Sequence, residues 1–273
     1  MDCLLKIATD AALEAGKEIM RIYDDPSQDF GIERKDDNSP LTLADKAAHD
    51  CIVRHLEPTG IPILSEEGAH LPYEVRKEWH RLWIVDPLDG TKEFIKKNGE
   101  FTVNIALVED GKPILGVIYV PATGVLYGGE TSPVLSQGGE NGEGRSFCFE
   151  RRAWKEKQGV REMVNGKSSN GKCFTIVASR SHITPETEAF IEEMRKEHGE
   201  VRLISSGSSL KICLVAEGAA DVYPRFAPTM EWDTAAGDAI ARAAGKVVVD
   251  AKKGQPLTYN KPDLHNPWFI VRG

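Results

Sequence analysis

Apolar side chains recur every three or four positions in two stretches near the start of the chain. The spacing between residues 2 and 22 predicts an amphipathic helix. A second helix is predicted from Thr42 to Leu56, because Pro58 cannot continue it. The segment 24–40 between them is polar and interrupted by proline and glycine, and it predicts a mobile loop.

Continuous apolar runs, which are typical of buried strands, dominate the next part of the chain. The dipeptide Asp110-Gly111 stands between two such runs and is a strong hairpin signal. The strands expected here are residues 61–64, 82–85, 102–108, 114–120 and 125–127. Together with the two helices they predict an α+β half built on an antiparallel sheet.

Strand and helix patterns alternate in the last part of the chain. This alternation predicts an α/β half on a mixed sheet, stacked against the first half. The stretch 136–172 is rich in turn residues and charges, and we interpret it as a mobile excursion. The expected organisation is therefore an α+β half over residues 1–135, the excursion, and an α/β half over residues 173–273.

Composition and charge narrow the choice of partners. The chain of 273 residues has a net charge of −8, which argues against binding a nucleic-acid polymer, because its phosphate backbone requires concentrated Lys and Arg. The five cysteines are widely spaced and form no Cys-x-x-Cys pair, which favours reduced thiols in the cytoplasm over disulfides or a zinc site. The histidines show no metal-ligand spacing either. No run is apolar enough for a signal peptide or a transmembrane segment, while peripheral membrane association and the choice between monomer and homodimer stay open.

The most informative segment is Trp83–Thr91, where an apolar strand leads directly into two aspartates. Pro87 keeps Asp86 extended, and Gly90 permits a sharp turn immediately after Asp89. Such a turn can direct both carboxylates to one point.

The Leu88 carbonyl lies between these two acids and adds a third hard oxygen, a ligand set that suits Mg²⁺. Thr91 can cap a short helix over residues 92–96, whose N–H groups would favour a bound phosphate. The alternative is an ordinary Asp-Gly turn in which Asp86 only caps the backbone.

Two further acids lie at the ends of predicted elements. Glu66 follows the short strand at residues 61–64, where paired glutamates can simply be solvated loop charges. Asp233 is expected at the N-cap of an alanine-rich helix over residues 234–244. A capping carboxylate is also well placed to hold a cation beside an anion at the start of the helix.

Taken together, these segments resemble the inositol monophosphatase superfamily. The motifs are Leu64–Glu67, Trp83–Thr91 and Trp232–Asp238, and the similarity extends over nearly the whole chain. The residues Lys92–Ile95 after the central motif, and the segment Ser39–Lys46, are similar to the 3'(2'),5'-bisphosphate nucleotidase branch of that superfamily.

The resemblance implies a layered α+β/α/β fold like that of sugar phosphatases, with two or three Mg²⁺ ions. Our hypothesis gives Glu66, Asp86 and the Leu88 carbonyl to one ion, and Asp86, Asp89 and Asp233 to a second. A third, weaker ion and inhibition by lithium are also implied. The ions would neutralise the phosphate dianion and stabilise the leaving oxygen.

The catalytic residues implied by the resemblance are Glu66, Thr91 and Asp45. Glu66 and Thr91 would orient the attacking water, and Asp45 would hydrogen-bond Thr91 and make it a better proton acceptor. No covalent phospho-enzyme is expected.

The substrate contacts implied by the resemblance fall into two groups. The residues around the scissile phosphate are Asp89, Gly90, Thr91 and Asp233. The residues expected to contact the nucleotide and its second phosphate are His182, Ser208, Lys211 and Arg225. Because serine-rich loops are common caps and single basic residues are usually solvated, a purely structural role for the second group is the alternative.

The function expected from the resemblance is hydrolysis of 3'-phosphoadenosine 5'-phosphate, a small nucleotide, to AMP and phosphate. One rival is an inositol monophosphatase or sugar bisphosphatase. A rival of another class is a metal-dependent regulatory protein without catalysis, which the complete set of acids disfavours.

Overall fold

The computed structural model of the protein describes residues 2–26, 30–34, 40–69, 71–135, 147–167, 171, 173–179 and 184–273. Its larger sheet has seven strands in the order β3-β4-β5-β6-β7-β8-β9, of which β3 and β4 are parallel and all other neighbours antiparallel. The strands are β3 (Ile63–Ser65), β4 (Arg81–Asp89), β5 (Thr102–Glu109), β6 (Lys112–Val120), β7 (Val125–Leu135), β8 (Phe147–Lys157) and β9 (Val160–Val164).

The smaller sheet has five strands in the order β11-β10-β12-β14-β13, and it is mixed. Strand β10 pairs in parallel with β11 and β12, whereas β14 pairs antiparallel with β12 and β13. The strands are β10 (Phe174–Ser179), β11 (Val201–Ser206), β12 (Val222–Arg225), β13 (Val247–Asp250) and β14 (Phe269–Arg272). The strands β1 (Glu33–Arg34) and β2 (Pro40–Leu41) pair with each other and belong to neither of these sheets.

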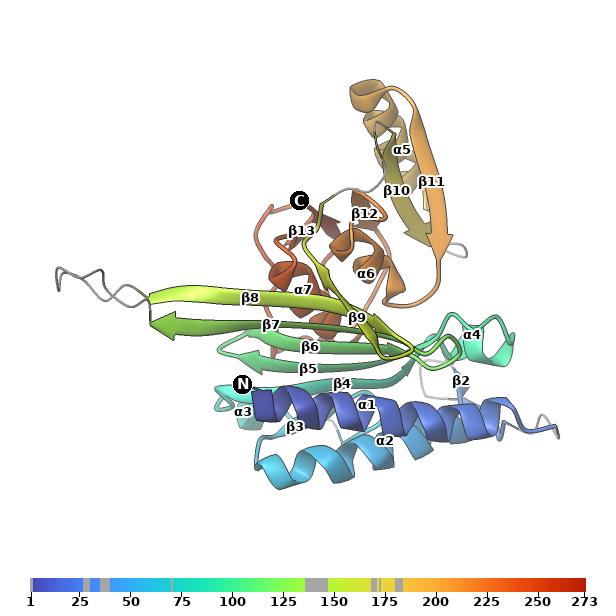
Figure 1. The fold of residues 1–273 in the computed structure, drawn as a ribbon, viewed down its shortest axis with the longest axis vertical. Helices are drawn as coiled ribbons and strands as arrows, with labels where there is room; N and C mark the ends of the chain where they lie inside the picture. The colour runs from blue at the N-terminus through green and yellow to red at the C-terminus, as the bar shows by residue number, and fades with distance from the viewer. Residues whose placement is uncertain are drawn as a thin grey trace.

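Helices separate and cover the sheets, so that the molecule has five layers (Figure 1). The long helices α1 (Asp2–Tyr23) and α2 (Leu43–Leu56) pack on the outer face of the seven-stranded sheet. The helices α6 (Leu210–Ala216) and α7 (Glu231–Ala243) lie between the sheets, and α5 (Pro185–His198) packs on the far face of the smaller one. The short helices are η1 (Glu57–Thr59), α3 (Tyr73–Arg76) and α4 (Thr91–Ile95). This architecture confirms the predicted fold class.

Two glycines let α7 lie unusually close to the seven-stranded sheet. A Cβ atom on Gly116 in β6 would lie 2.2 Å from the Ala236 carbonyl oxygen, and one on Gly129 in β7 would lie 2.6 Å from the Ile240 Cα. Because such distances are far below van der Waals contact, only glycine fits at these positions. The helix that carries Asp233 therefore packs closely on β6 and β7, and it also contacts β4, the strand that carries Asp86 and Asp89.

The predicted excursion over residues 136–172 is wrong for residues 147–164. These residues form β8 and β9, which extend the seven-stranded sheet, and β8 pairs with β7 along its whole length. The high charge of β8 and β9 hid their strand pattern, although Ala153 and Trp154 are buried. Residues 136–146 lie outside the described part of the chain.

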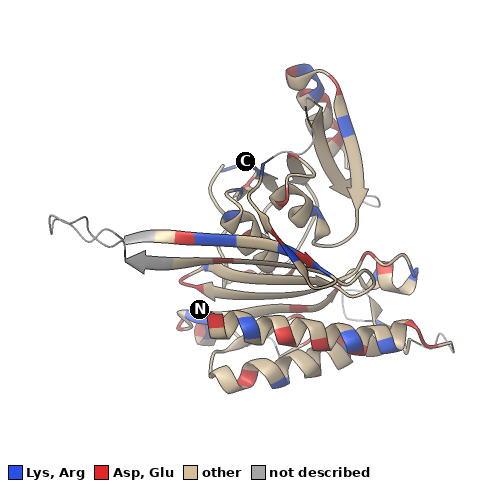
Figure 2. Cartoon of the chain, in the orientation of Figure 1, with Lys and Arg blue, Asp and Glu red and all other residues tan. Residues whose placement is uncertain are grey.

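Charged side chains of both signs are interspersed along α1 and α5 (Figure 2). The first helix carries Lys6–Asp10 and Arg21–Glu18 ion pairs on its solvent side, so opposite charges largely offset each other there. Within the described residues, no helix combines the length and the apolar character needed to cross a bilayer.

Candidate metal and phosphate site

A bulge in β4 brings two aspartates to the same edge of the larger sheet. Asp86 pairs with Asn104 of β5, and Asp89 pairs with Thr102, so three steps along β4 oppose two along β5. In a regular strand, residues three apart point to opposite faces, and the extra residue corrects this. Gly90 follows with a φ of 93°, a left-handed conformation that favours glycine.

Three acids from distant segments converge beside this bulge. Glu66 at the end of β3, Asp86 in β4 and Asp233 in α7 each offer a carboxylate oxygen, and these oxygens all lie within 4.8 Å of one another. Asp86 is 1% exposed, and its Oδ2 has no hydrogen-bond partner among the described residues. A buried carboxylate oxygen without a donor, in an all-oxygen group, fits a hard divalent cation such as Mg²⁺.

The raised pKa values of these acids also fit a site for a cation. Burial raises the pKa of Asp86 well above its usual range, and the nearby Glu66, Asp89 and Asp233 carboxylates raise it further. Burial and Asp89 likewise raise the pKa of Asp233 to about 8, against the lowering effects of the Met230 N–H and of Arg225. A bound cation would stabilise the ionised form of these clustered carboxylates.

Asp233 does not occupy the N-cap of its helix as predicted. The helix begins earlier, at Glu231, with Met230 as the N-cap, and the Met230 N–H donates to Asp233 Oδ2 over 2.8 Å. Asn266 holds this turn in place, because its Nδ2 donates to the Met230 carbonyl at 2.6 Å and to Thr234 Oγ1 at 3.0 Å. The acid thus belongs to the first turn, with one oxygen fixed by the backbone.

Asp89 is fixed by a residue that the sequence analysis missed. The N–H and hydroxyl of Ser209 each lie 2.6 Å from Asp89 Oδ2, and Asn104 Nδ2 donates to the same hydroxyl over 2.9 Å. Ser209 Oγ also lies 2.9 Å from the Asp233 carbonyl oxygen, so one side chain connects both acids. The only signal for this role was its place in a serine-rich loop between a strand and a helix.

Thr91 and Asp45 lie together as the resemblance implied. Thr91 Oγ1 donates to Asp45 Oδ1 over 3.1 Å, while the Leu88 carbonyl is a more distant acceptor at 3.4 Å. Asp45 Oδ2 accepts from the N–H and hydroxyl of Thr42 at 2.7 and 2.6 Å, in the capping box of α2. Burial raises the pKa of Asp45 and the Thr42 hydrogen bonds lower it, with a net increase. Thr91 is the first residue of α4 and not its cap, because Gly90 takes that position.

A cavity of about 320 Å³ opens beside the acids. Its walls come from both sheets and include Asp89, Asp233, Ser208, Lys211 and Arg225. This volume lies at the lower end of the range for small-molecule sites.

Lys211 and Arg225 bring positive charge to the inner wall of this cavity. Lys211 is buried, and its Nζ donates to the carbonyls of Ser206 and Ser208 at 3.2 and 2.6 Å. Burial lowers the pKa of Lys211 to about 8; Asp89 raises it and Arg225 lowers it further. Arg225, the last residue of β12, has a buried Nε without a partner among the described residues.

The other two predicted nucleotide contacts have different outcomes. Ser208 lines the cavity, with a φ of 40°, and its hydroxyl donates to the Glu100 carbonyl over 3.1 Å. It precedes α6, which begins at Leu210 and not at Ser208 as predicted. His182 lies outside the described residues.

Comparison with known proteins places the chain in a family. The model of the inositol monophosphatase family matches residues 1–268. The 3'(2'),5'-bisphosphate nucleotidase CysQ of Shigella flexneri is 47% identical over 264 residues, which cover 95% of this chain and 96% of that protein. The crystal structure of CysQ from Bacteroides thetaiotaomicron is 54% identical, with a TM-score of 0.83, and the match covers 99% of this chain and 97% of that one. The suppressor protein SuhB of Bartonella henselae is 25% identical, with a TM-score of 0.71 over 99% of this chain and 93% of that one. The chain therefore belongs to the inositol monophosphatase family.

Proposed function

We propose that the protein is a Mg²⁺-dependent 3'(2'),5'-bisphosphate nucleotidase that converts 3'-phosphoadenosine 5'-phosphate to AMP and phosphate. The observation that carries this proposal is the convergence of Glu66, Asp86 and Asp233, with an unpartnered Asp86 oxygen, beside a cavity whose lining includes the basic side chains of Lys211 and Arg225. The 47% identity to the 3'(2'),5'-bisphosphate nucleotidase CysQ of Shigella flexneri supports the choice of substrate.

The residues that would hold two or three Mg²⁺ ions are Glu66, Asp86, the Leu88 carbonyl, Asp89 and Asp233. When bound, Mg²⁺ supplies positive charge that neutralises the phosphate dianion and the charge that develops on the leaving oxygen. The protein contributes by holding these oxygens in place before substrate arrives. The Ser209 and Met230 N–H groups do this for Asp89 and Asp233.

Thr91 and Asp45 form the proton-handling part of the site. Because the Thr91 hydroxyl donates to Asp45 Oδ1, the lone pairs of Thr91 Oγ1 remain available to accept a hydrogen bond from a water placed for attack. Glu66 is a second acceptor for that water. Thr42 fixes the other Asp45 oxygen, which keeps Asp45 Oδ1 in place as the nearer acceptor for the Thr91 hydroxyl.

The second phosphate of the substrate would lie against Lys211 and Arg225. A bisphosphate carries its second anion away from the metal ions, where it needs a separate source of positive charge. The unpartnered Arg225 Nε and the buried Lys211 ammonium offer it on the cavity wall. This need distinguishes the nucleotidase from a phosphatase that acts on a monophosphorylated inositol.

The proposal is tested by phosphate release from 3'-phosphoadenosine 5'-phosphate, inositol 1-phosphate and fructose 1,6-bisphosphate at one Mg²⁺ concentration. We expect the nucleotide to have the highest kcat/KM, AMP to be the organic product, and EDTA to abolish turnover. A higher kcat/KM for either rival substrate would overturn the choice of substrate. Turnover that survives EDTA would overturn the metal assignment.

The cellular setting belongs to the same proposal. Cytoplasmic residence is supported by Cys3, Cys51, Cys173 and Cys213, which are free thiols in the described part of the chain. The protein would act there as a monomer or homodimer on a small nucleotide, without a nucleic-acid polymer as partner.

A further inference from the structure

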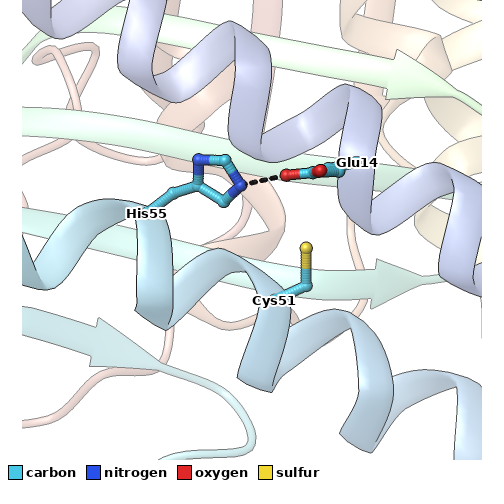
Figure 3. A group of neighbouring side chains, drawn as sticks. All are labelled: Glu14, Cys51 and His55. Atoms are coloured by element: carbon cyan, nitrogen blue, oxygen red, sulfur yellow. Dashed lines mark hydrogen bonds and ion pairs between the residues drawn. The ribbon is translucent and has the colours of Figure 1, made fainter.

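A second group of side chains that could hold a metal ion lies on the opposite face of the larger sheet from Asp233. Glu14 of α1 and Cys51 and His55 of α2 each offer one ligand atom, and these atoms all lie within 4.8 Å of one another. Figure 3 shows the His55 ring and the Cys51 thiol directed from α2 toward Glu14. Cys51 and His55 are four residues apart, so they share one face of their helix.

The surroundings of this group leave room for an ion. A cavity of about 250 Å³ is lined by Glu14, Glu18, Cys51, Arg54 and His55. The Cys51 side chain is 2% exposed, whereas His55 and Glu14 form an ion pair that reaches solvent. An ion here would therefore have a buried sulfur ligand on one side and access to water on the other.

The chemistry of the donors differs from that of the candidate phosphatase site. Glu66, Asp86 and Asp233 offer oxygen alone, which suits Mg²⁺, whereas this group offers one sulfur, one nitrogen and one oxygen. Mixed thiolate, imidazole and carboxylate ligation with an open position is typical of Zn²⁺. We propose that Glu14, Cys51 and His55 form a Zn²⁺ site that joins α1 to α2.

Binding would replace protons by the ion. The contact between His55 Nε2 and Glu14 Oε2 would open, and the proton on Nε2 would pass to solvent, with the neutral ring carrying its remaining proton on Nδ1. The Nε2 lone pair and the Glu14 oxygen would then each bond to Zn²⁺, and the Cys51 thiol would likewise release its proton to solvent as the Zn–S bond forms. A water molecule would complete the tetrahedron. The Cys51 thiolate and the Glu14 carboxylate together balance the two positive charges of the ion, and Glu18 and Arg54, which also line the cavity, carry opposite charges.

Sequence spacing alone did not reveal this site. A Cys-x₃-His pair supplies only two ligands, and the third comes from a helix that lies 37 positions earlier, from Glu14 to Cys51. The close packing of α1 against α2 brings the three together.

The test uses the full-length protein with thiols reduced and saturating Mg²⁺ present throughout, and Co²⁺ as a spectroscopic probe. We expect one equivalent of Co²⁺ to produce a thiolate-to-metal charge-transfer band, and Zn²⁺ to displace it. The phosphatase site has no sulfur ligand and cannot produce this band. Absence of the band in the wild-type protein would overturn the proposal.

Single substitutions assign the ligands. Cys51→Ser should remove the band, and His55→Gln and Glu14→Gln should weaken Co²⁺ binding at least about tenfold. The His55 and Glu14 side chains are 29% and 56% exposed, so these two variants should fold even if Cys51→Ser does not. Matched controls are Cys3→Ser, an exposed thiol, and His80→Gln, an exposed His–Asp pair elsewhere; both should bind like the wild type. Equal binding by His55→Gln, Glu14→Gln and the controls would refute the site.

Discussion

Among single residues, Asp86 shows how the function of the site opposes stability. Its Oδ1 accepts the Leu88 N–H at 3.0 Å, but its Oδ2 is buried among other acids without a donor. A folded chain that only had to be stable would not retain this oxygen. An unpartnered buried carboxylate of this kind is expected where a ligand completes the structure.

The substitution Asp86→Asn separates stability from activity. The amide keeps the Oδ1 acceptor and removes the charge, so the metal-free variant should unfold at a higher temperature than the metal-free wild type. Mg²⁺ should raise the unfolding temperature of the wild type but have little effect on the variant, and the variant should lose most turnover. Thermal unfolding in EDTA and in Mg²⁺ measures the metal-free stability and the stabilisation by Mg²⁺. An equal rise in unfolding temperature with Mg²⁺ in the two proteins would contradict the role of Asp86.

Thr91 offers a test of the proton-handling geometry. Thr91→Ala removes the hydroxyl that donates to Asp45, and we expect kcat to fall about 100-fold or more with little change in KM. Thr91→Ser keeps the hydroxyl and should retain most of the activity. Steady-state kinetics distinguish them, and an effect of Thr91→Ala on KM alone would place Thr91 outside the chemical step.

The buried ammonium of Lys211 predicts a pH dependence. Its pKa is lowered to about 8, so it is charged below that pH and neutral above it. If it holds the second phosphate, kcat/KM for the nucleotide should fall as the pH rises through about 8. Lys211→Met should have a lower kcat/KM at pH 7 and no such fall, whereas Lys211→Arg should keep its charge to higher pH. An identical fall in Lys211→Met would assign the titration to another group.

At the scale of elements, α7 can pack closely on the sheet because Gly116 and Gly129 have no side chains. Gly116→Ala would place a methyl group 2.2 Å from the Ala236 carbonyl oxygen and push the helix outward. We expect a loss of roughly 1–3 kcal/mol in the free energy of unfolding and weaker Mg²⁺ binding, because Asp233 moves with α7. Urea unfolding and Mg²⁺ titration measure the two effects.

The matched control for this prediction is Gly60→Asn. Gly60 has a φ of 68° and open space where a Cβ would lie, and asparagine tolerates that conformation. Gly60→Asn should change neither the free energy of unfolding nor Mg²⁺ binding by much. If Gly116→Ala alters Mg²⁺ binding no more than this control does, the coupling between sheet and helix is refuted.

Elements with strong local patterns could be predicted from the sequence. The apolar spacing of α1 and α2, and the hairpin between β5 and β6, gave those elements nearly to their ends. The strands β8 and β9 were missed, because their residues are highly charged and their position at one edge of the sheet depends on pairing with β7. Such pairing is a property of the whole sheet and leaves little trace in the local sequence.

At the scale of the whole molecule, a loop near the C-terminus connects the two halves. Fully buried Glu231 of α7 accepts the N–H of Asn260 at 2.6 Å and pairs with Lys261 Nζ at 2.5 Å. Asn260 in turn accepts from Arg76 Nη1 of the first half at 2.7 Å and donates to the Arg76 carbonyl at 2.8 Å. One buried acid thus orders the loop that joins α7 to α3.

The substitution Lys261→Met should cost about 2 kcal/mol of unfolding free energy, because it leaves the Glu231 charge buried with backbone donors alone. Adding Glu231→Gln should restore part of this loss, because the uncompensated charge is then gone. Urea unfolding of the wild type, the two single variants and the double variant gives a double-mutant cycle. Strictly additive losses would show that the pair is not coupled.

In the candidate site, too, local motifs could be predicted from the sequence and long-range contacts could not. The Asp-Pro-Leu-Asp-Gly segment could be recognised in the sequence, whereas the bulge that it forms within β4, and the roles of Ser209 and Asn104, could not. Their role depends on a loop of the second half meeting a strand of the first, over 105 positions from Asn104 to Ser209. Long-range contacts of this kind become visible only once the layers are assembled.

The order in which the acids occur along the chain has a consequence for biosynthesis. Glu66, Asp86 and Asp89 leave the ribosome long before Asp233, and at about 5–20 residues per second the delay is several seconds or more. Until α7 emerges, the nascent polypeptide has neither the last carboxylate nor the helix that covers the sheet behind the others. If Asp233 is a metal ligand as we propose, hydrolysis is withheld from unfinished chains, and translation that stalls before residue 233 yields a product that cannot consume nucleotide.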